Sequence, residues 1–229
     1  MRRRLVAWMV AGAVFSFCAA AGAAPFGILL GPDRIVLDTP SGFADTAAFG
    51  SPRLTDLAAD LAEGGSRVLV FALSDADARR FAAGDALELR RYLLAVTPRA
   101  KERDRMSVAQ FGELVEEIER NFDPSFASPE DYRIYLQARP AGQSHLLAKL
   151  RRDPQQVSLL YGTMVPQPPP SFWREDKPPV FKLSTTSLVL IGGRAVYVSA
   201  FSAYDSPADV FWIRGIAESW VEELRRLNK

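Results

Sequence analysis

Histidine and cysteine are almost missing from the chain, whose 229 residues include only His145 and Cys18. Histidine is the usual general base near neutral pH, and together with cysteine it supplies most zinc ligands. One residue of each type is too few for a zinc site built from several of them, so we predict no metal site. A single cysteine forms no intrachain disulfide, so stability has to come from an ordinary apolar core.

The motifs of common nucleotide and hydrolase sites are also missing. The sequence contains no G-x-G-x-x-G and no P-loop, so nothing indicates a dinucleotide or nucleoside-triphosphate site. It contains no G-x-S-x-G elbow, and no serine begins an S-x-x-K. Ser144 and His145 are adjacent, but we interpret Ser144 as the N-cap of a helix over 144–152. We therefore predict no catalytic residues and no cofactor.

The N-terminus has the pattern of a secretory signal peptide. Residues 2–4 are arginines, residues 5–21 carry no charge, and residues 21–23 read Ala-Gly-Ala, which fits the A-x-A cleavage rule. We predict that residues 1–23 are removed and that the protein is periplasmic or secreted. An uncleaved N-terminal anchor is the alternative, because about 20 apolar residues can span a bilayer.

Removal of residues 1–23 would change the charge of the chain. The segment takes three of the 28 basic residues and none of the 27 acidic ones, so the net charge becomes about −2. A faintly acidic chain has no electrostatic attraction to nucleic acid or anionic lipid. We predict no nucleic-acid partner, no stable transmembrane segment after cleavage, and a single domain over 24–229.

Serine–proline pairs mark the starts of three helices. Ser51-Pro52, Ser128-Pro129 and Ser206-Pro207 each place a capping oxygen before a proline, which the first helical turn tolerates. The predicted helices run from 52 to the glycines at 64 and 65, and over 75–82, 107–122, 129–138, 144–152 and 207–227. The last of these is expected to bury Val210, Ile213, Ala217, Trp220, Val221 and Leu224.

Apolar runs predict seven strands, over 26–30, 34–38, 67–73, 89–97, 156–164, 180–191 and 194–204. The runs at 68–73 and 92–96 do not alternate, so both faces of these strands should be covered. Gly192-Gly193 is typical of a two-residue hairpin turn, which makes the flanking strands antiparallel. We predict an α+β fold with a largely antiparallel or mixed sheet covered by helices, an α-β-α sandwich.

The element order resembles the Mog1/PsbP/DcrB-like α-β-α sandwich superfamily over roughly 34–64 and 180–227. The resemblance rests on the turn Asp38-Thr39-Pro40-Ser41-Gly42-Phe43, a late long hairpin, and a closing helix introduced by Tyr204-Asp205-Ser206-Pro207-Ala208-Asp209. It implies the same sandwich fold and a small accessory or binding protein without a common catalytic centre. It implies no particular site residue.

The proline-rich segment 166–179 holds the candidate binding residues Phe172, Trp173 and Arg174. Large apolar side chains on loops often close a pocket or meet a partner. The alternative is that both rings pack onto the sheet and anchor the segment.

Other charged patterns have structural explanations. Asp75 and Asp77 resemble a D-x-D metal motif, but a helix capped by Ser74 would hold both in its first turn, where the helix dipole favours acids. The basic residues over 99–105 alternate with acids, so their field largely cancels. We interpret the glutamates at 113, 116, 117 and 119 as a solvated helix face.

These observations favour an exported, non-catalytic binding or accessory protein of the cell envelope, whose partner is an unidentified envelope protein or a small apolar ligand. One alternative is a carboxylate-dependent hydrolase of envelope glycan, with Asp38 and Asp205 as candidates; it needs two acids ~5–10 Å apart in a groove. The other is a structural subunit of an envelope complex, which would expose an apolar patch of several hundred Å².

Overall fold

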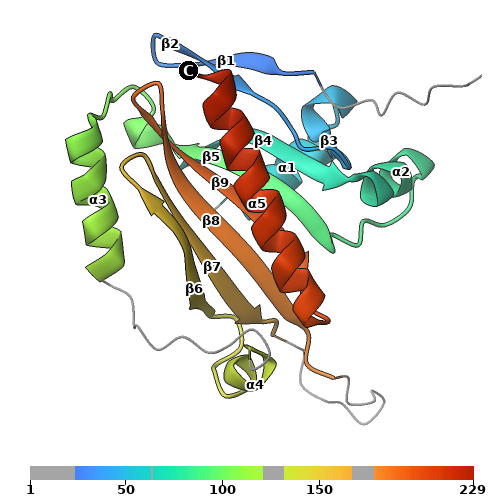
Figure 1. Cartoon of the computed structure of the whole chain (residues 1–229). Coiled ribbons are helices and arrows are strands. Elements are labelled where there is room, and N and C mark those ends of the chain that lie inside the picture. Colours follow the sequence, from blue (N-terminus) through green and yellow to red (C-terminus); the bar gives the residue numbers. More distant parts are fainter. Residues whose placement is uncertain (1–23, 63, 121–131, 167–177) are drawn as a thin grey trace, which may run out of the picture.

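The computed structural model describes residues 24–62, 64–120, 132–166 and 178–229. The predicted signal peptide over 1–23 lies outside the described residues, and so do Phe172, Trp173 and Arg174. Within the described ranges, a seven-stranded sheet carries helices on both faces, and a two-stranded sheet stands beside one end of it (Figure 1). The helices of the described ranges include none with both the length and the apolarity to cross a bilayer.

The seven-stranded sheet has the strand order β3-β4-β5-β9-β8-β7-β6, and every neighbouring pair is antiparallel. Its strands are β3 (Phe43–Asp45), β4 (Ser66–Ser74), β5 (Arg91–Pro98), β6 (Ser144–Asp153), β7 (Gln156–Met164), β8 (Phe181–Ile191) and β9 (Arg194–Ala203). The predicted α+β class is therefore confirmed, and the described sheet is antiparallel throughout rather than mixed.

The chain builds this sheet as two runs of neighbouring strands. The first run is β3, β4 and β5; the chain then passes through α3 (Val108–Arg120) and α4 (Tyr132–Gln137) and re-enters at the far edge as β6. The second run, β6 to β9, returns until β9 pairs with β5. The predicted hairpin joins β8 to β9, and Gly192 and Gly193 have φ of 57° and 77°, values that favour glycine.

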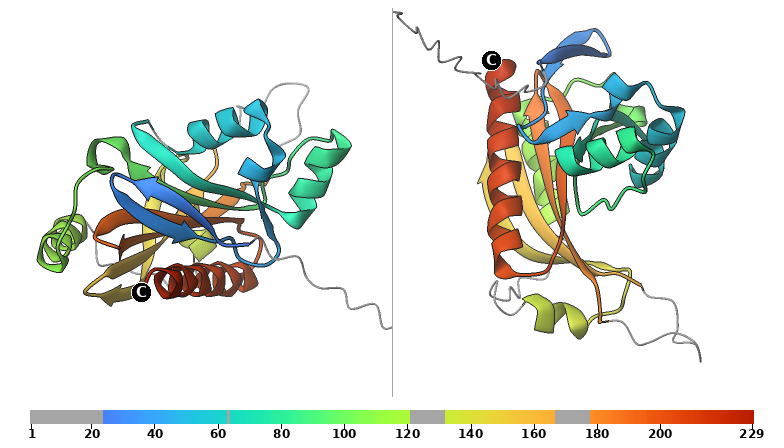
Figure 2. Two further views of the ribbon diagram at one scale, coloured as in Figure 1. Left: turned by 90° about the horizontal axis from the view of Figure 1, so that it is seen from above. Right: turned by 90° about the vertical axis from the view of Figure 1, so that its right-hand side faces the viewer.

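One face of the sheet is covered by α5 (Pro207–Leu227), which lies across β8 and β9 (Figure 2). The helix begins with a capping box between Ser206 and Asp209. The Trp220 side chain is 1% exposed, and its Nε1 donates a hydrogen bond of 2.8 Å to the carbonyl oxygen of Asp38. The residues that the helix buries are the expected ones: Val210, Ile213, Ala217, Trp220, Val221 and Leu224.

Among the described elements, those that pack on the opposite face lie at its two sides. Helix α1 (Pro52–Leu61) packs Leu54 and Ala58 against Phe71 and Leu94 of β4 and β5, and α2 (Asp75–Ala83) lies beside it. At the other side, α3 packs Phe111 and Val115 against residues of β7 and β8, Val157, Leu159, Leu188 and Leu190. Strands β4 and β5 thus have apolar contacts on both faces, as their unbroken apolar runs predicted.

The two-stranded sheet of β1 (Phe26–Leu30) and β2 (Asp33–Leu37) is attached by polar contacts at both of its ends. The guanidinium of Arg194, which is 2% exposed, donates to Asp33 Oδ2 over 3.0 and 2.6 Å. The Arg194 and Arg105 guanidinium groups hold the pKa of Asp33 below its usual value. The Asn228 side chain pairs with both the amide and the carbonyl of Val36, so it occupies hydrogen-bonding groups on β2.

The prediction of a helix over 144–152 is wrong, because this segment is the edge strand β6. Leu147 belongs to the main core cluster and lies near Leu136 of α4, whereas Leu146 packs with the α3 cluster, so the strand has apolar contacts on both faces. A strand with apolar residues on both faces and two register shifts has no clean alternation, and its pattern can be mistaken for a helical one. The short edge strand β3 was not predicted, and of the predicted helix over 129–138 the described part is α4.

Candidate functional site

A groove crosses the sheet face opposite α5, in the gap between α1 and α3. Strands β5, β9, β8 and β7 form its floor, Leu61 and Ala62 at the C-terminal end of α1 form one wall, and the groove encloses about 530 Å³. On the far side, Tyr161 and Tyr197 pack against the apolar cluster of α3. We call this the sheet-face groove; its volume lies in the range of small-molecule pockets.

The strand register places the floor residues in adjacent cross-strand rows. In one row Tyr161 pairs with Ser184, which pairs with Phe201. In the next, Thr186 pairs with Ser199, and the hydroxyl of Ser199 donates to Thr186 Oγ1 over 3.4 Å. Two hydroxyl groups therefore lie at the centre of the floor.

The two sides of the groove differ in chemistry. On the side of α1 and β5 the lining is mostly aliphatic and consists of Leu61, Ala62, Leu94, Val96 and Pro98, with Ser66 beside them. On the side of β6 to β9 the lining consists of hydroxyl and aromatic side chains: Ser144, Tyr161, Ser184, Thr186, Tyr197, Ser199 and Phe201. The groove is thus amphipathic across its width.

The described residues that line the groove carry no charge. Burial raises the pKa of the Tyr161 and Tyr197 phenols above 10.0, so both stay protonated at neutral pH. The lining therefore offers neutral hydroxyl groups that can donate or accept hydrogen bonds, together with apolar surface.

An aromatic stack supports one end of the floor. The Phe201 ring lies on the Tyr92 ring with centroids 4.4 Å apart and an interplanar angle of 9°, and Phe71 meets Tyr92 edge-on at 6.2 Å. Tyr92 is 5% exposed, and burial raises its pKa from 10.0 to about 12. Stacking of this kind fixes the orientation of the Phe201 ring in the groove.

Asp38 and Asp205, the two carboxylates suggested for a hydrolase, lie far apart. Asp38 lies at the C-terminal end of α5, near Glu223 and Arg226, and burial raises its pKa. Asp205 precedes the N-terminus of the same helix and pairs with Arg90. A rise of 1.5 Å per helical residue puts the two acids roughly 25 Å apart, far beyond the spacing that glycoside hydrolysis needs. Neither lines the sheet-face groove.

The D-x-D pattern at 75–77 has the structural role expected for it. The Ser74 hydroxyl accepts a hydrogen bond from the Asp77 amide and so caps α2. The Asp77 carboxylate is buried and accepts the Glu88 amide over 2.8 Å. Over the described ranges, no group of three or more His, Cys, Asp or Glu side chains could hold a metal ion.

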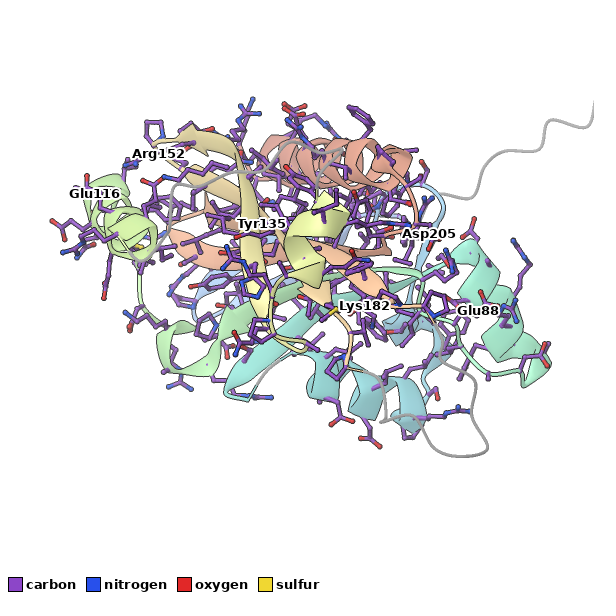
Figure 3. All side chains as sticks on the ribbon, turned by 90° about the horizontal axis from the view of Figure 1, so that it is seen from below. Glu88, Glu116, Tyr135, Arg152, Lys182 and Asp205 are labelled. Atoms are coloured by element: carbon purple, nitrogen blue, oxygen red, sulfur yellow. The ribbon has the colours of Figure 1, made fainter. Side chains whose placement is uncertain are left out.

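The glutamates of α3 are only partly a solvated face. Glu119 is 12% exposed and forms ion pairs with Lys149 and Arg152 of β6, and Glu116 lies beside Arg152 (Figure 3).

A hollow of about 390 Å³ between α3 and the 101–106 segment is lined by charges of both signs, namely Lys101, Asp104, Arg105, Glu113, Glu117 and Arg120. Three of these side chains are positive and three are negative, so their fields largely cancel.

Ser144 and His145 are consecutive residues of a strand, so their side chains point to opposite faces of the sheet. Ser144 is not a helix cap; it lies in β6, and its hydroxyl contacts Thr163 Oγ1 at 2.9 Å. His145 lies edge-on to the Tyr135 ring, and burial and Arg139 lower its pKa. The neutral imidazole is the form that this apolar contact favours.

The groove residues were missed by the sequence analysis, although a signal for them exists. Positions 184 and 186 on one strand, and 197, 199 and 201 on the next, alternate with residues buried beneath α5. This alternation places hydroxyl and aromatic side chains together on one sheet face. The alternation does not predict that a groove lies between α1 and α3, because the positions of these helices depend on tertiary packing.

The comparisons with known proteins add no relative. No family model, no curated protein and no solved structure matches the chain.

Proposed function

We propose that the protein is an exported, non-catalytic binding protein of the cell envelope that takes a small ligand into the sheet-face groove. The observation that carries the proposal is the groove itself: an amphipathic hollow of about 530 Å³ between α1 and α3, whose described lining residues carry no charge. Hydroxyl groups and apolar surface are suited to holding a ligand in one orientation. The resemblance to the Mog1/PsbP/DcrB-like superfamily stays a prediction and points to the same kind of function.

The groove is tested by filling it. In Ser199→Phe, a phenyl ring would occupy the centre of the floor, where the Ser199 and Thr186 hydroxyls lie. We expect the apparent Kd for N-phenyl-1-naphthylamine, an uncharged probe that fluoresces in apolar sites, to rise at least about tenfold. Fluorescence titration measures this change.

The matched control is Ser219→Phe, which puts the same ring on the exposed side of α5 and should leave the Kd unchanged. Ser184→Phe fills the neighbouring row and serves if Ser199→Phe fails to fold. Equal Kd values for the wild type and both groove variants would contradict the proposal.

Export is tested on the N-terminus of the protein from the envelope of an expressing bacterium. We expect the fractionated protein to begin at Ala24, because the Ala-Gly-Ala sequence at 21–23 directs cleavage there. Mass spectrometry of the intact chain distinguishes this result from a chain that retains residues 1–23. A full-length chain in the membrane fraction would support the anchored alternative, and one in the cytosol would contradict export.

A further inference from the structure

We infer that the ligand of the sheet-face groove is an uncharged acyl ester, a molecule with an aliphatic chain and ester or hydroxyl groups along one side. This inference rests on the proposed function, since it names the ligand class of the same groove. It follows from the division of the lining into an aliphatic side and a hydroxyl side.

The aliphatic side defines the first half of the ligand. Leu61, Leu94 and Val96 present only carbon to the groove, and Leu94 is 5% exposed. A ligand hydroxyl or amide placed against them would lose its hydrogen bonds to water and gain none. This surface fits a hydrocarbon chain and does not fit a sugar, which carries hydroxyl groups around its whole edge.

The hydroxyl side defines the second half. Thr186 and Ser199 share a hydrogen bond at the centre of the floor, and Ser184 pairs with Phe201 in the adjoining row. A hydroxyl group can turn its O–H toward a ligand carbonyl while still accepting from a neighbour. Ester and hydroxyl oxygens are neutral groups that such a row can satisfy.

Because the described lining carries no charge, the groove should favour an ester over the corresponding acid. A carboxylate or phosphate in the groove would give up its hydration without an arginine or lysine to compensate, because the described lining holds neither. Lys182 lies at the exposed start of β8 and is not part of the lining (Figure 3). The groove should therefore prefer a neutral ester to a fatty acid or a phospholipid headgroup.

The test is competition against N-phenyl-1-naphthylamine by three molecules below their aggregation limits: monolaurin, dodecanoate and maltose. We expect monolaurin to displace the probe at a concentration at least about tenfold lower than dodecanoate, and maltose not to displace it. The double variant Thr186→Val, Ser199→Ala removes the central hydroxyls and keeps the shape. It should weaken monolaurin about five- to tenfold more than it weakens the probe, because only monolaurin uses the hydroxyls. The surface variant Ser219→Ala should leave the binding of both molecules unchanged.

The outcomes separate the two proposals. If the probe binds in the groove and Ser199→Phe blocks it, but dodecanoate or maltose competes as well as monolaurin, the ester inference fails and the binding function stands. If the double variant binds monolaurin as tightly as the wild type, the ester inference also fails. If Ser199→Phe leaves probe binding unchanged, the groove is not the site and the proposed function itself fails.

Discussion

Replacing Trp220 by alanine should lower the free energy of unfolding by about 3–5 kcal/mol, the largest loss we expect from a single substitution. The indole is 1% exposed between α5 and the sheet, and its removal would leave a cavity in the largest core cluster. It would also leave the Asp38 carbonyl without the Nε1 donor at 2.8 Å. Urea unfolding followed by circular dichroism measures the change.

The variant Trp220→Phe separates the cost of the cavity from the cost of the lost hydrogen bond. The phenyl ring fills most of the space but donates no hydrogen bond, so we expect a smaller loss of about 1–3 kcal/mol. Ser219→Ala, at the exposed neighbouring position, should change the stability by less than about 0.5 kcal/mol. A loss below about 1 kcal/mol for Trp220→Ala would show that α5 is not held to the sheet through this side chain.

Alkaline pH should destabilise the protein, and Tyr92 should account for much of the effect. Burial raises the folded-state pKa of this phenol from 10.0 to about 12, so the unfolded chain releases the proton first. The stabilisation is complete below pH 10 and is lost as the pH rises through about 12. A difference of about two units corresponds to ~3 kcal/mol. Burial raises the pKa of Tyr132, Tyr161, Tyr197 and Tyr204 too, which adds in the same direction.

The measurement compares urea midpoints of the wild type and Tyr92→Phe between pH 7 and 11.5. Phenolate absorbance at 295 nm reports the ionisation itself. The variant keeps a ring between Phe71 and Phe201 but has no proton to lose, so its stability should fall less steeply above pH 10. Parallel curves for the two proteins would contradict the role of Tyr92.

Much of the fold could be predicted because its signals are local. The helix over 207–227 was predicted at its observed bounds, since Ser206-Pro207 and the apolar spacing up to Leu224 lie within the helix itself. The Gly192-Gly193 turn is equally local. Strand β6 was not predicted, because Leu146 packs with the α3 cluster and Leu147 with the core cluster on the other face, so its apolar residues do not alternate.

The candidate site could not be predicted for a related reason. Leu94 and Ser199 are neighbours across two strands, and nothing close to either residue in the sequence identifies the other. The hydroxyl and aromatic positions at 184, 186, 197, 199 and 201 follow a simple alternation. The alternation does not tell that α1 and α3 pack on either side of these positions rather than over them, because the positions of the two helices depend on tertiary packing.

The pairing of β5 with β9 has a consequence for how the molecule folds. Each run of strands, β3 to β5 and β6 to β9, is closed by contacts between consecutive strands, whereas Tyr92 and Phe201 pair across about a hundred residues. Closing such a long loop is slow compared with forming local hairpins, so the β5–β9 pairing should form late. The aliphatic side of the groove belongs to the part of the chain up to β5, and the hydroxyl side, apart from Ser66, belongs to strands β6 to β9. A bound ligand would therefore contact both runs of strands and slow the separation of β5 from β9.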